Sequence, residues 1–353
     1  MRWRWYRRIL IVLAFTAAFG GTILYINEDS NVEQQEVSKD DLQNMRLIPG
    51  GMPIGIYMEV DGILVLDTEA LEDINGNMCE PSKNIIKKGD YIISINQIDV
   101  EDKNDLIREV AHLKQSDVVI GIRREAECFE VSFKAVEVEN GEYKLGIWVR
   151  DNVQGLGTVT YIADDNQFGA LGHGIHDIDT DKLLTIKGGN IYEIDIIGIQ
   201  KGKRGEPGGM EGVIVYNQRN ILGDILVNSE NGIYGTIKKK EKLVESDEYL
   251  KICDKKDIQL GDAVIKSAIT GEVKEYDIKI VSVDYFTRNE NKRITIEVVD
   301  EELLEMTGGI VQGMSGSPVI QNGRIVGAVT HVLVNDPTRG YGIFIENMLD
   351  AED

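Results

Sequence analysis

Cysteine is scarce in this sequence: Cys79, Cys128 and Cys253 lie far apart, and no CxxC pair occurs. Three isolated cysteines exclude the disulfide framework of a small secreted domain and a cysteine-based zinc site. Basic residues are also few, because 38 Lys and Arg against 60 Asp and Glu leave a net charge of −22. Such a chain repels a phosphate backbone, so nucleic acid is not an expected partner.

Long, predominantly apolar runs are missing except near the N-terminus, where MRWRWYRR precedes eighteen uncharged residues from Ile9 to Ile26. Eighteen apolar residues are enough to span a bilayer as a helix, and the preceding arginines place the following chain outside the cytoplasm. We therefore predict a membrane anchor over residues 1–26, with a cleaved signal peptide as the alternative. Residues 27–45 are acidic and poor in large apolar side chains, which is typical of a solvated linker.

Residues 46–138 alternate strand-like runs with one helical run, NDLIREVAHL. The order, and the KKGDYIISIN segment above all, resembles a PDZ domain. The resemblance implies a groove that accepts a peptide by strand addition, with Ile54, Gly55 and Ile56 in the peptide-binding loop. Pro53 removes one backbone donor from that loop, which weighs against capture of a free C-terminus. A small β-domain that acts only as a spacer is the alternative.

Residues 139–353 contain many short strand signals separated by glycine turns and lack long helical periods. We expect a mainly β domain, and the length suits two packed six-stranded barrels.

One stretch of this domain, GMSGSPV, places Ser315 between glycines and before a proline. A β-hairpin signal follows, whereas the nucleophile elbow of an α/β-hydrolase needs a helix there. The stretch resembles the nucleophile loop of chymotrypsin-like serine proteases. In such a loop the amides of Gly313 and Ser315 would form an oxyanion hole. An ordinary Gly/Ser turn is the alternative.

A serine nucleophile needs a base, and the chain has only four histidines. His112 falls on the predicted helix of the PDZ-like segment, and a structural role is expected for His331. His173, between two glycines in GALGHGIHD, is the expected base. His173 and His176 with nearby aspartates could instead bind a metal ion.

The acid that would orient His173 is not selected by spacing. Asp300 ends an apolar strand fifteen residues before Ser315, while Asp224 and Asp262 also lie among apolar residues. All three remain candidates on these grounds.

The anchor, the acidic linker, the PDZ-like segment, GTVTYIADDNQFGALGHGI and the last fifty residues together closely resemble the SpoIVB family of sporulation serine peptidases. The resemblance implies the triad His173, Asp300 and Ser315, with no cofactor and no metal. It also implies a protease that cuts itself in trans. It would then cleave the extracytoplasmic part of a membrane complex restraining an intramembrane metalloprotease, and so trigger pro-sigma-K processing in the space between the forespore and mother-cell membranes. A non-catalytic PDZ scaffold and a metal-dependent hydrolase using His173 and His176 are the alternatives.

Overall fold

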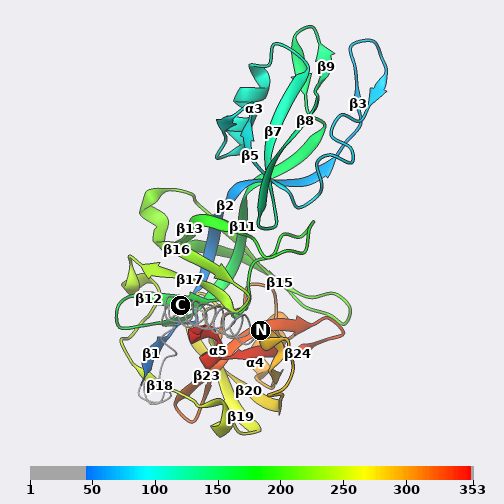
Figure 1. Cartoon of the computed structure of the whole chain (residues 1–353). Helices are drawn as coiled ribbons and strands as arrows, with labels where there is room; N and C mark the ends of the chain where they lie inside the picture. The colour runs from blue at the N-terminus through cyan, green and yellow to red at the C-terminus, as the bar shows by residue number, and fades with distance from the viewer. Residues whose placement is uncertain (1–44, 351–353) are drawn as a thin grey trace, which may run out of the picture. The chain divides into compact units, whose positions relative to one another are not determined.

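The computed structural model describes residues 45–350 (Figure 1). The predicted anchor and the acidic linker up to residue 44 lie outside this range. Among residues 45–350, no helix combines the length and the apolar character that a membrane crossing requires.

The chain is mainly β, as predicted, because β-branched residues alternate with polar ones and glycines interrupt the runs. The strands are β1 Arg46–Pro49, β2 Pro53–Thr68, β3 Leu71–Glu72, β4 Met78–Cys79, β5 Tyr91–Ile95, β6 Ile98–Asp99, β7 Asp117–Arg124, β8 Glu127–Lys134, β9 Val136–Glu139, β10 Glu142–Lys144, β11 Ile147–Ile162, β12 Gln167–Ala170, β13 Ile186–Tyr192, β14 Ile194–Gln200, β15 Gly209–Ile214, β16 Ile221–Ser229, β17 Gly232–Ile237, β18 Leu250–Ile252, β19 Gly261–Ser267, β20 Lys274–Val283, β21 Ile294–Val298, β22 Pro318–Gln321, β23 Arg324–Leu333 and β24 Asp336–Phe344. The helices are α3 Lys103–Ala111, α4 Glu301–Thr307 and α5 Ile345–Leu349, with short 3₁₀ turns η1 Gln218–Asn220, η2 Lys240–Lys242, η3 Lys255–Asp257 and η4 Glu290–Lys292.

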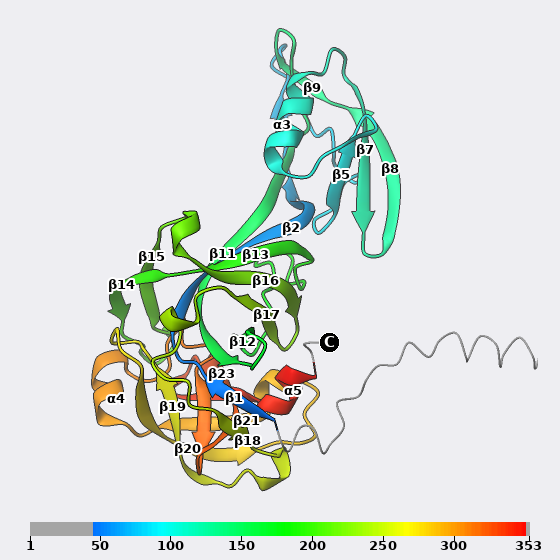
Figure 2. The same ribbon diagram turned by 90° about the vertical axis from the view of Figure 1, so that its left-hand side faces the viewer.

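Two sets of strands close on themselves. In the first barrel, β2 pairs with β13, then β16, β17, β12 and β11 follow in turn, and β11 pairs back with β2. In the second barrel, β19 pairs with β20, β21, β24, β23 and β22 follow, and β22 pairs back with β19. Each barrel encloses its own apolar core, so the expected pair of six-stranded barrels is present (Figure 2).

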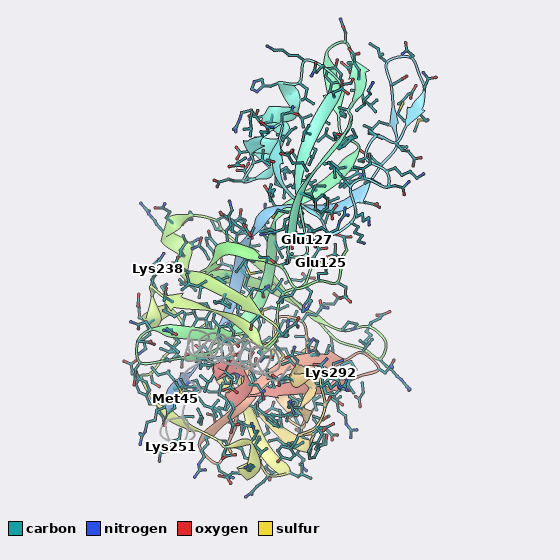
Figure 3. The ribbon with its side chains drawn as sticks, viewed as in Figure 1. Met45, Glu125, Glu127, Lys238, Lys251 and Lys292 are labelled. Atoms are coloured by element: carbon teal, nitrogen blue, oxygen red, sulfur yellow. The ribbon has the colours of Figure 1, made fainter. Side chains whose placement is uncertain are left out.

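Strands β2 and β11 are each 16 residues long and pair along nearly their whole length. The N-terminal half of β2 and the C-terminal half of β11 belong to the first barrel. The other halves of these two strands join β5, β7, β8 and helix α3 around a separate apolar core. We call this part of the chain the inserted module (residues 61–150). Asp102 caps α3 by accepting a hydrogen bond from the Asp105 amide. Glu125 lies in the β7–β8 turn, and Glu127 is the first residue of β8 (Figure 3). The predicted helix is therefore present in this module.

The predicted start of the PDZ-like segment at residue 46 is wrong. Ile48, Ile54, Ile56 and Met58 are buried in the core of the first barrel, together with side chains of β12, β16 and β17. The alternating pattern predicted the strands correctly. It could not show that one strand serves two cores.

The predicted peptide-binding residues Ile54, Gly55 and Ile56 need the same correction. They lie in β2 between β11 and β13, and both edges of the strand are already hydrogen-bonded. The amides of the preceding Gly50 and Gly51 donate to the carbonyls of Thr160 and Val159. Among residues 45–350, β2 therefore has no open edge at Gly55 and Ile56 to which a peptide could add as a strand.

Candidate active site

The loop that carries Ser315 joins α4 to β22 and depends on glycine. Gly313 and Gly316 have φ values of 100° and 98°, a region that other residues rarely adopt. A Cβ at Gly316 would lie 2.0 Å from the carbonyl oxygen of Thr158. The glycines therefore allow this loop of the second barrel to lie directly against strand β11 of the first.

Thr158 of β11 holds the loop at two points. Its amide donates to the Ser315 carbonyl at 2.9 Å, and its buried hydroxyl donates to the Gly313 carbonyl at 2.8 Å. Both carbonyls are thereby turned toward β11. Within residues 45–350, neither the Gly313 amide nor the Ser315 amide has a hydrogen-bond acceptor. Two free donors beside one serine are what an oxyanion hole requires.

The Ser315 hydroxyl donates to the carbonyl oxygen of Thr330 on β23 at 2.6 Å. Thr330 is itself fixed, because its hydroxyl donates to the Asn291 carbonyl at 2.5 Å. In the described part of the chain no hydrogen bond joins Ser315 to His173. The hydroxyl must therefore leave Thr330 before a base can take its proton.

His173 follows β12 through a turn in which Leu171 and Gly172 have φ values of 71° and 69°. A Cβ at Gly172 would lie 3.0 Å from Cγ2 of Thr330, so this turn of the first barrel packs against β23. The His173 ring lies 4.9 Å from the ring of His331, centroid to centroid. Ser315 and His173 thus meet the same short segment, Thr330 and His331, from the two barrels.

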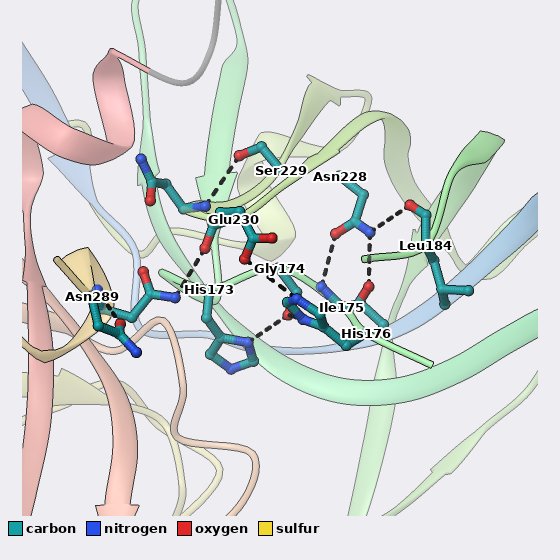
Figure 4. Close-up of polar contacts among 11 residues, drawn as sticks. His173, Gly174, Ile175, His176, Leu184, Asn228, Ser229, Glu230 and Asn289 are labelled. Atoms are coloured by element: carbon teal, nitrogen blue, oxygen red, sulfur yellow. Dashed lines mark hydrogen bonds and ion pairs between the residues drawn. The ribbon is translucent and has the colours of Figure 1, made fainter. Parts of the chain in front are cut away.

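The Nδ1 atom of His173 lies 2.9 Å from the carbonyl oxygen of Gly174 (Figure 4). A carbonyl can only accept, so Nδ1 carries the proton and Nε2 is left with the lone pair in the neutral ring. This tautomer is the one that a general base needs. Burial lowers the pKa of His173 below its usual value, the Gly174 carbonyl opposes that shift, and His176 adds to it.

His331, for which the sequence predicted a structural role, lies against His173, a contact that sequence reasoning missed. Desolvation first, then the neighbouring His173 and Lys292, lowers its pKa to about 4. Lys292 lies on η4, next to the strand that carries His331 (Figure 3). The chain has only four histidines, and one of them lies on the hairpin that follows Ser315. That position was the available signal.

The loop after His173 is held by Asn228 of β16. Its side chain accepts from the Ile175 amide and donates to the carbonyls of Ile175 and Leu184, each at 2.9 Å (Figure 4). His176 is partly buried: its Nε2 lies 3.3 Å from a carboxylate oxygen of Glu230, and its Nδ1 lies 3.4 Å from the Gly174 carbonyl oxygen. No group of three or more His, Cys, Asp or Glu side chains among residues 45–350 is arranged to hold a metal ion.

None of the three candidate acids, Asp224, Asp262 and Asp300, contacts His173 within residues 45–350. Asp224 pairs with Lys238 at 2.5 Å and accepts from Asn190. Asp262 lines a cavity of about 400 Å³ on the outer face of the second barrel, which neither Ser315 nor His173 lines. Asp300 accepts a hydrogen bond from the Leu303 amide at the start of α4. The structure brings Ser315, His173 and the two free amides to one place, and brings none of these three carboxylates to His173.

Replacing Gly316 by Ala tests the close contact between the Ser315 loop and β11. The new Cβ would meet Thr158 and Leu171 backbone atoms at 2.0 and 2.6 Å, in a strained backbone conformation. We expect a loss of about 2–4 kcal/mol in the free energy of unfolding, measured by urea denaturation. The matched control is Gly323→Ala, which has a positive φ but nothing within 4 Å, and should lose about 1 kcal/mol. Equal losses in the free energy of unfolding of the two variants would contradict the importance of this close contact.

Comparison with known proteins identifies the family of the chain. The sequence model of a family described as SpoIVB peptidase S55 matches residues 141–349. No curated protein matches the chain. Among solved structures, the inactive form of the Rv3671c protease is 14% identical over 56% of this chain and 82% of that chain, with a TM-score of 0.29. The active form of Rv3671c from M. tuberculosis is 13% identical over 56% and 73%, with a TM-score of 0.33. Because the family match spans more than half of the chain, this protein belongs to the SpoIVB peptidase S55 family and is a serine protease.

Proposed function

We propose that Ser315 is the nucleophile and His173 the general base of this protease. The observation that carries the proposal is the loop of Ser315, which is fixed by Thr158 and keeps two amides free beside the serine. The neutral tautomer of His173, set by the Gly174 carbonyl, supports it. The ring of His331, tilted against that of His173, limits the positions that the imidazole can take.

The reaction follows from these groups. When a peptide carbonyl reaches the loop, the Ser315 hydroxyl turns from Thr330 and attacks the carbonyl carbon. Its proton passes to Nε2 of His173, and the amides of Gly313 and Ser315 stabilise the oxyanion. His173 then gives the proton to the leaving amine, which departs and leaves an acyl-enzyme. Water, activated by the same imidazole, releases the second product.

The biological role that we propose is that of a sporulation signalling protease. It is anchored by residues 1–26, acts outside the cytoplasm, and cuts itself in trans. It then cleaves the extracytoplasmic part of a membrane complex that restrains an intramembrane metalloprotease. Family membership supports this role, and so does the acidic segment after the predicted anchor, because a chain without an apolar core enters a protease cleft at little unfolding cost.

We further propose that the inserted module is a PDZ-related domain that helps to position protein substrates. Its support is the packing of α3 on a sheet formed by β2, β5, β7 and β8, around a core that is separate from both barrels. Its long strands β2 and β11 continue into the first barrel. The module is therefore covalently joined to the protease barrels, so a substrate bound to the module would have a raised local concentration at the barrels.

Ser315→Ala tests the nucleophile. We expect peptide cleavage and labelling by a fluorophosphonate probe to disappear, with the fold intact, because removal of a triad serine leaves only about 10³ to 10⁴ over water. Ser317→Ala is the matched control. The Ser317 hydroxyl is fully buried and has no partner among the described residues, so its loss should preserve activity and stability. Near-normal cleavage by Ser315→Ala would refute the assignment.

Self-processing is tested with the same variant. Full-length Ser315→Ala should keep its N-terminus when incubated alone, and should be shortened within residues 27–45 when active protein is added in trans. Mass spectrometry of the N-terminus identifies the cut. If the inactive variant is shortened equally without active protein, another protease makes the cut.

The pH dependence follows from burial of the base. Catalysis needs neutral His173, and burial lowers its pKa from the ordinary 6.5, so protonation stops the reaction only at lower pH. We expect kcat/KM to fall on the acid side with a midpoint below 6.5, and the rate of probe labelling to follow the same curve. A midpoint above 7 would show that a negative group faces the imidazole.

A further inference from the structure

The β14–β15 hairpin leaves the first barrel between β13 and β16 and packs on the second barrel (Figure 2). Three isoleucines of β14 pack against the core of the second barrel: Ile194, Ile196 and Ile199. Met210 of β15 is 7% exposed and belongs to that core. One face of the hairpin is therefore part of the packing of the second barrel, although its ends belong to the first.

The turn of the hairpin, residues 201–208, lies against the C-terminal end of α4. The ammonium group of Lys201 donates to the carbonyl of Glu305 at 2.7 Å, and the amide of Gly202 donates to the carbonyl of Thr307 at 2.8 Å. These bonds satisfy carbonyls that the end of a helix leaves without partners. The hairpin is thus fixed against the chain that leads from α4 into the Ser315 loop.

The hairpin pairs with this loop at Gln312. The Gln312 amide donates to the Gly208 carbonyl at 2.9 Å, and the Met210 amide donates to the Gln312 carbonyl at 2.8 Å. Gly209 and Gln312 thereby form an isolated parallel β-bridge. Both backbone groups of Gln312, the residue before Gly313, are therefore bonded to the hairpin.

The bond from Met210 sets the direction of the Gly313 amide. The Gln312 carbonyl and the Gly313 N–H belong to one peptide unit, and in a trans peptide they point to opposite sides. Because the carbonyl points to the hairpin, the N–H points away from it, and it has no acceptor among residues 45–350. If this peptide unit turned over, the N–H groups of Gly313 and Met210 would face each other, and the amide of the buried Met210 would lose its acceptor. The hairpin therefore favours the direction that an oxyanion hole needs.

We propose that Met210 is a positioning residue for the oxyanion hole: its amide holds the Gln312–Gly313 peptide so that the Gly313 N–H faces the carbonyl of a bound substrate. Met210 touches no reacting atom and acts through Gly313. The proposal rests on the function proposed for Ser315. The first barrel then fixes the loop at two places, with Thr158 at its carbonyls and the hairpin at Gln312.

Met210→Pro removes the amide donor, because proline has no N–H, and Met210→Ala is its matched control, which also loses the side chain but keeps the donor. Fluorophosphonate labelling of the full-length protein is measured as a maximal rate, kinact, and a half-saturating probe concentration, KI. We expect Met210→Pro to lower kinact by about 10²-fold with KI within about threefold of wild type, since loss of one oxyanion donor slows the chemical step by about 10²–10³. Met210→Ala should lower Tm, as a core truncation does, and keep kinact within about threefold of wild type. Equal kinact in the two folded variants would overturn the proposal.

Two neighbouring glycines give an independent pair of variants. A Cβ at Gly208 would lie 2.4 Å from the carbonyl oxygen of Gln200 and 2.7 Å from Cγ1 of Val311, so Gly208→Ala forces the hairpin away from the loop. A Cβ at Gly209 would meet only side-chain atoms of Gln312, at 3.8 and 3.9 Å. We expect Gly208→Ala to lower kinact by more than about tenfold, and Gly209→Ala to label like wild type. A folded Gly208→Ala that labels as fast as Gly209→Ala would contradict the role of the hairpin.

If the variants do not fold, hydrogen exchange of the wild-type protein decides. The Gln312 amide, bonded to Gly208, should exchange at least about tenfold more slowly than the Gly313 amide, and equal exchange of the two would overturn the proposal. If wild-type protein does not label at Ser315, the proposed nucleophile fails, and the exchange at Gln312 still decides whether the hairpin holds this peptide.

Discussion

The attachment of the Ser315 loop to Thr158 is the interaction on which the rest of the site depends. One residue of the first barrel donates two hydrogen bonds to carbonyls of the second, and it does so while fully buried. Those bonds hold the Gly313 and Ser315 carbonyls toward β11, and the amides of the same residues have no acceptor among residues 45–350. Glycine at position 316 is necessary for this approach, since any side chain would collide with the Thr158 carbonyl. The two amides of the proposed oxyanion hole therefore lie where the barrels meet.

His173 is held in place by hydrogen bonds and packing contacts in the same way. The turn at Gly172 packs on Thr330, Asn228 holds the following loop, and the Gly174 carbonyl selects the tautomer of His173. Carbonyl oxygens orient an imidazole without adding a full negative charge beside it. Burial then dominates the electrostatics, and the pKa of His173 falls below its usual value. A base of this kind stays neutral over a wide pH range, at the cost of a smaller driving force for taking the serine proton.

Much of the barrel architecture and part of the site could be predicted from the sequence, because they depend on local patterns. Alternating apolar residues and glycine turns indicated two β-barrels, the Gly-Ser turn indicated Ser315, and scarcity of histidine left His173. The boundary of the inserted module could not be read, since each half of β2 has the same alternation and only the partner strands decide which core it joins. The ring contact of His331 with His173 likewise depends on a contact between the barrels.

Asp300 shows a different limit. The stretch from Asp300 to Gly309, DEELLEMTGG, has every local signal of a short capped helix: an Asp cap, two acids in the first turn and glycine at the end. Read by itself, it indicates a structural carboxylate. Resemblance to a family of proteases favoured a catalytic role instead, because such families are expected to contain a triad. The two readings make different demands on geometry. A cap needs an amide three residues ahead, which the sequence itself supplies, while an acid needs an imidazole that only the fold can bring near. The geometry of the cap is observed in residues 45–350, and the catalytic role of Asp300 stays a prediction.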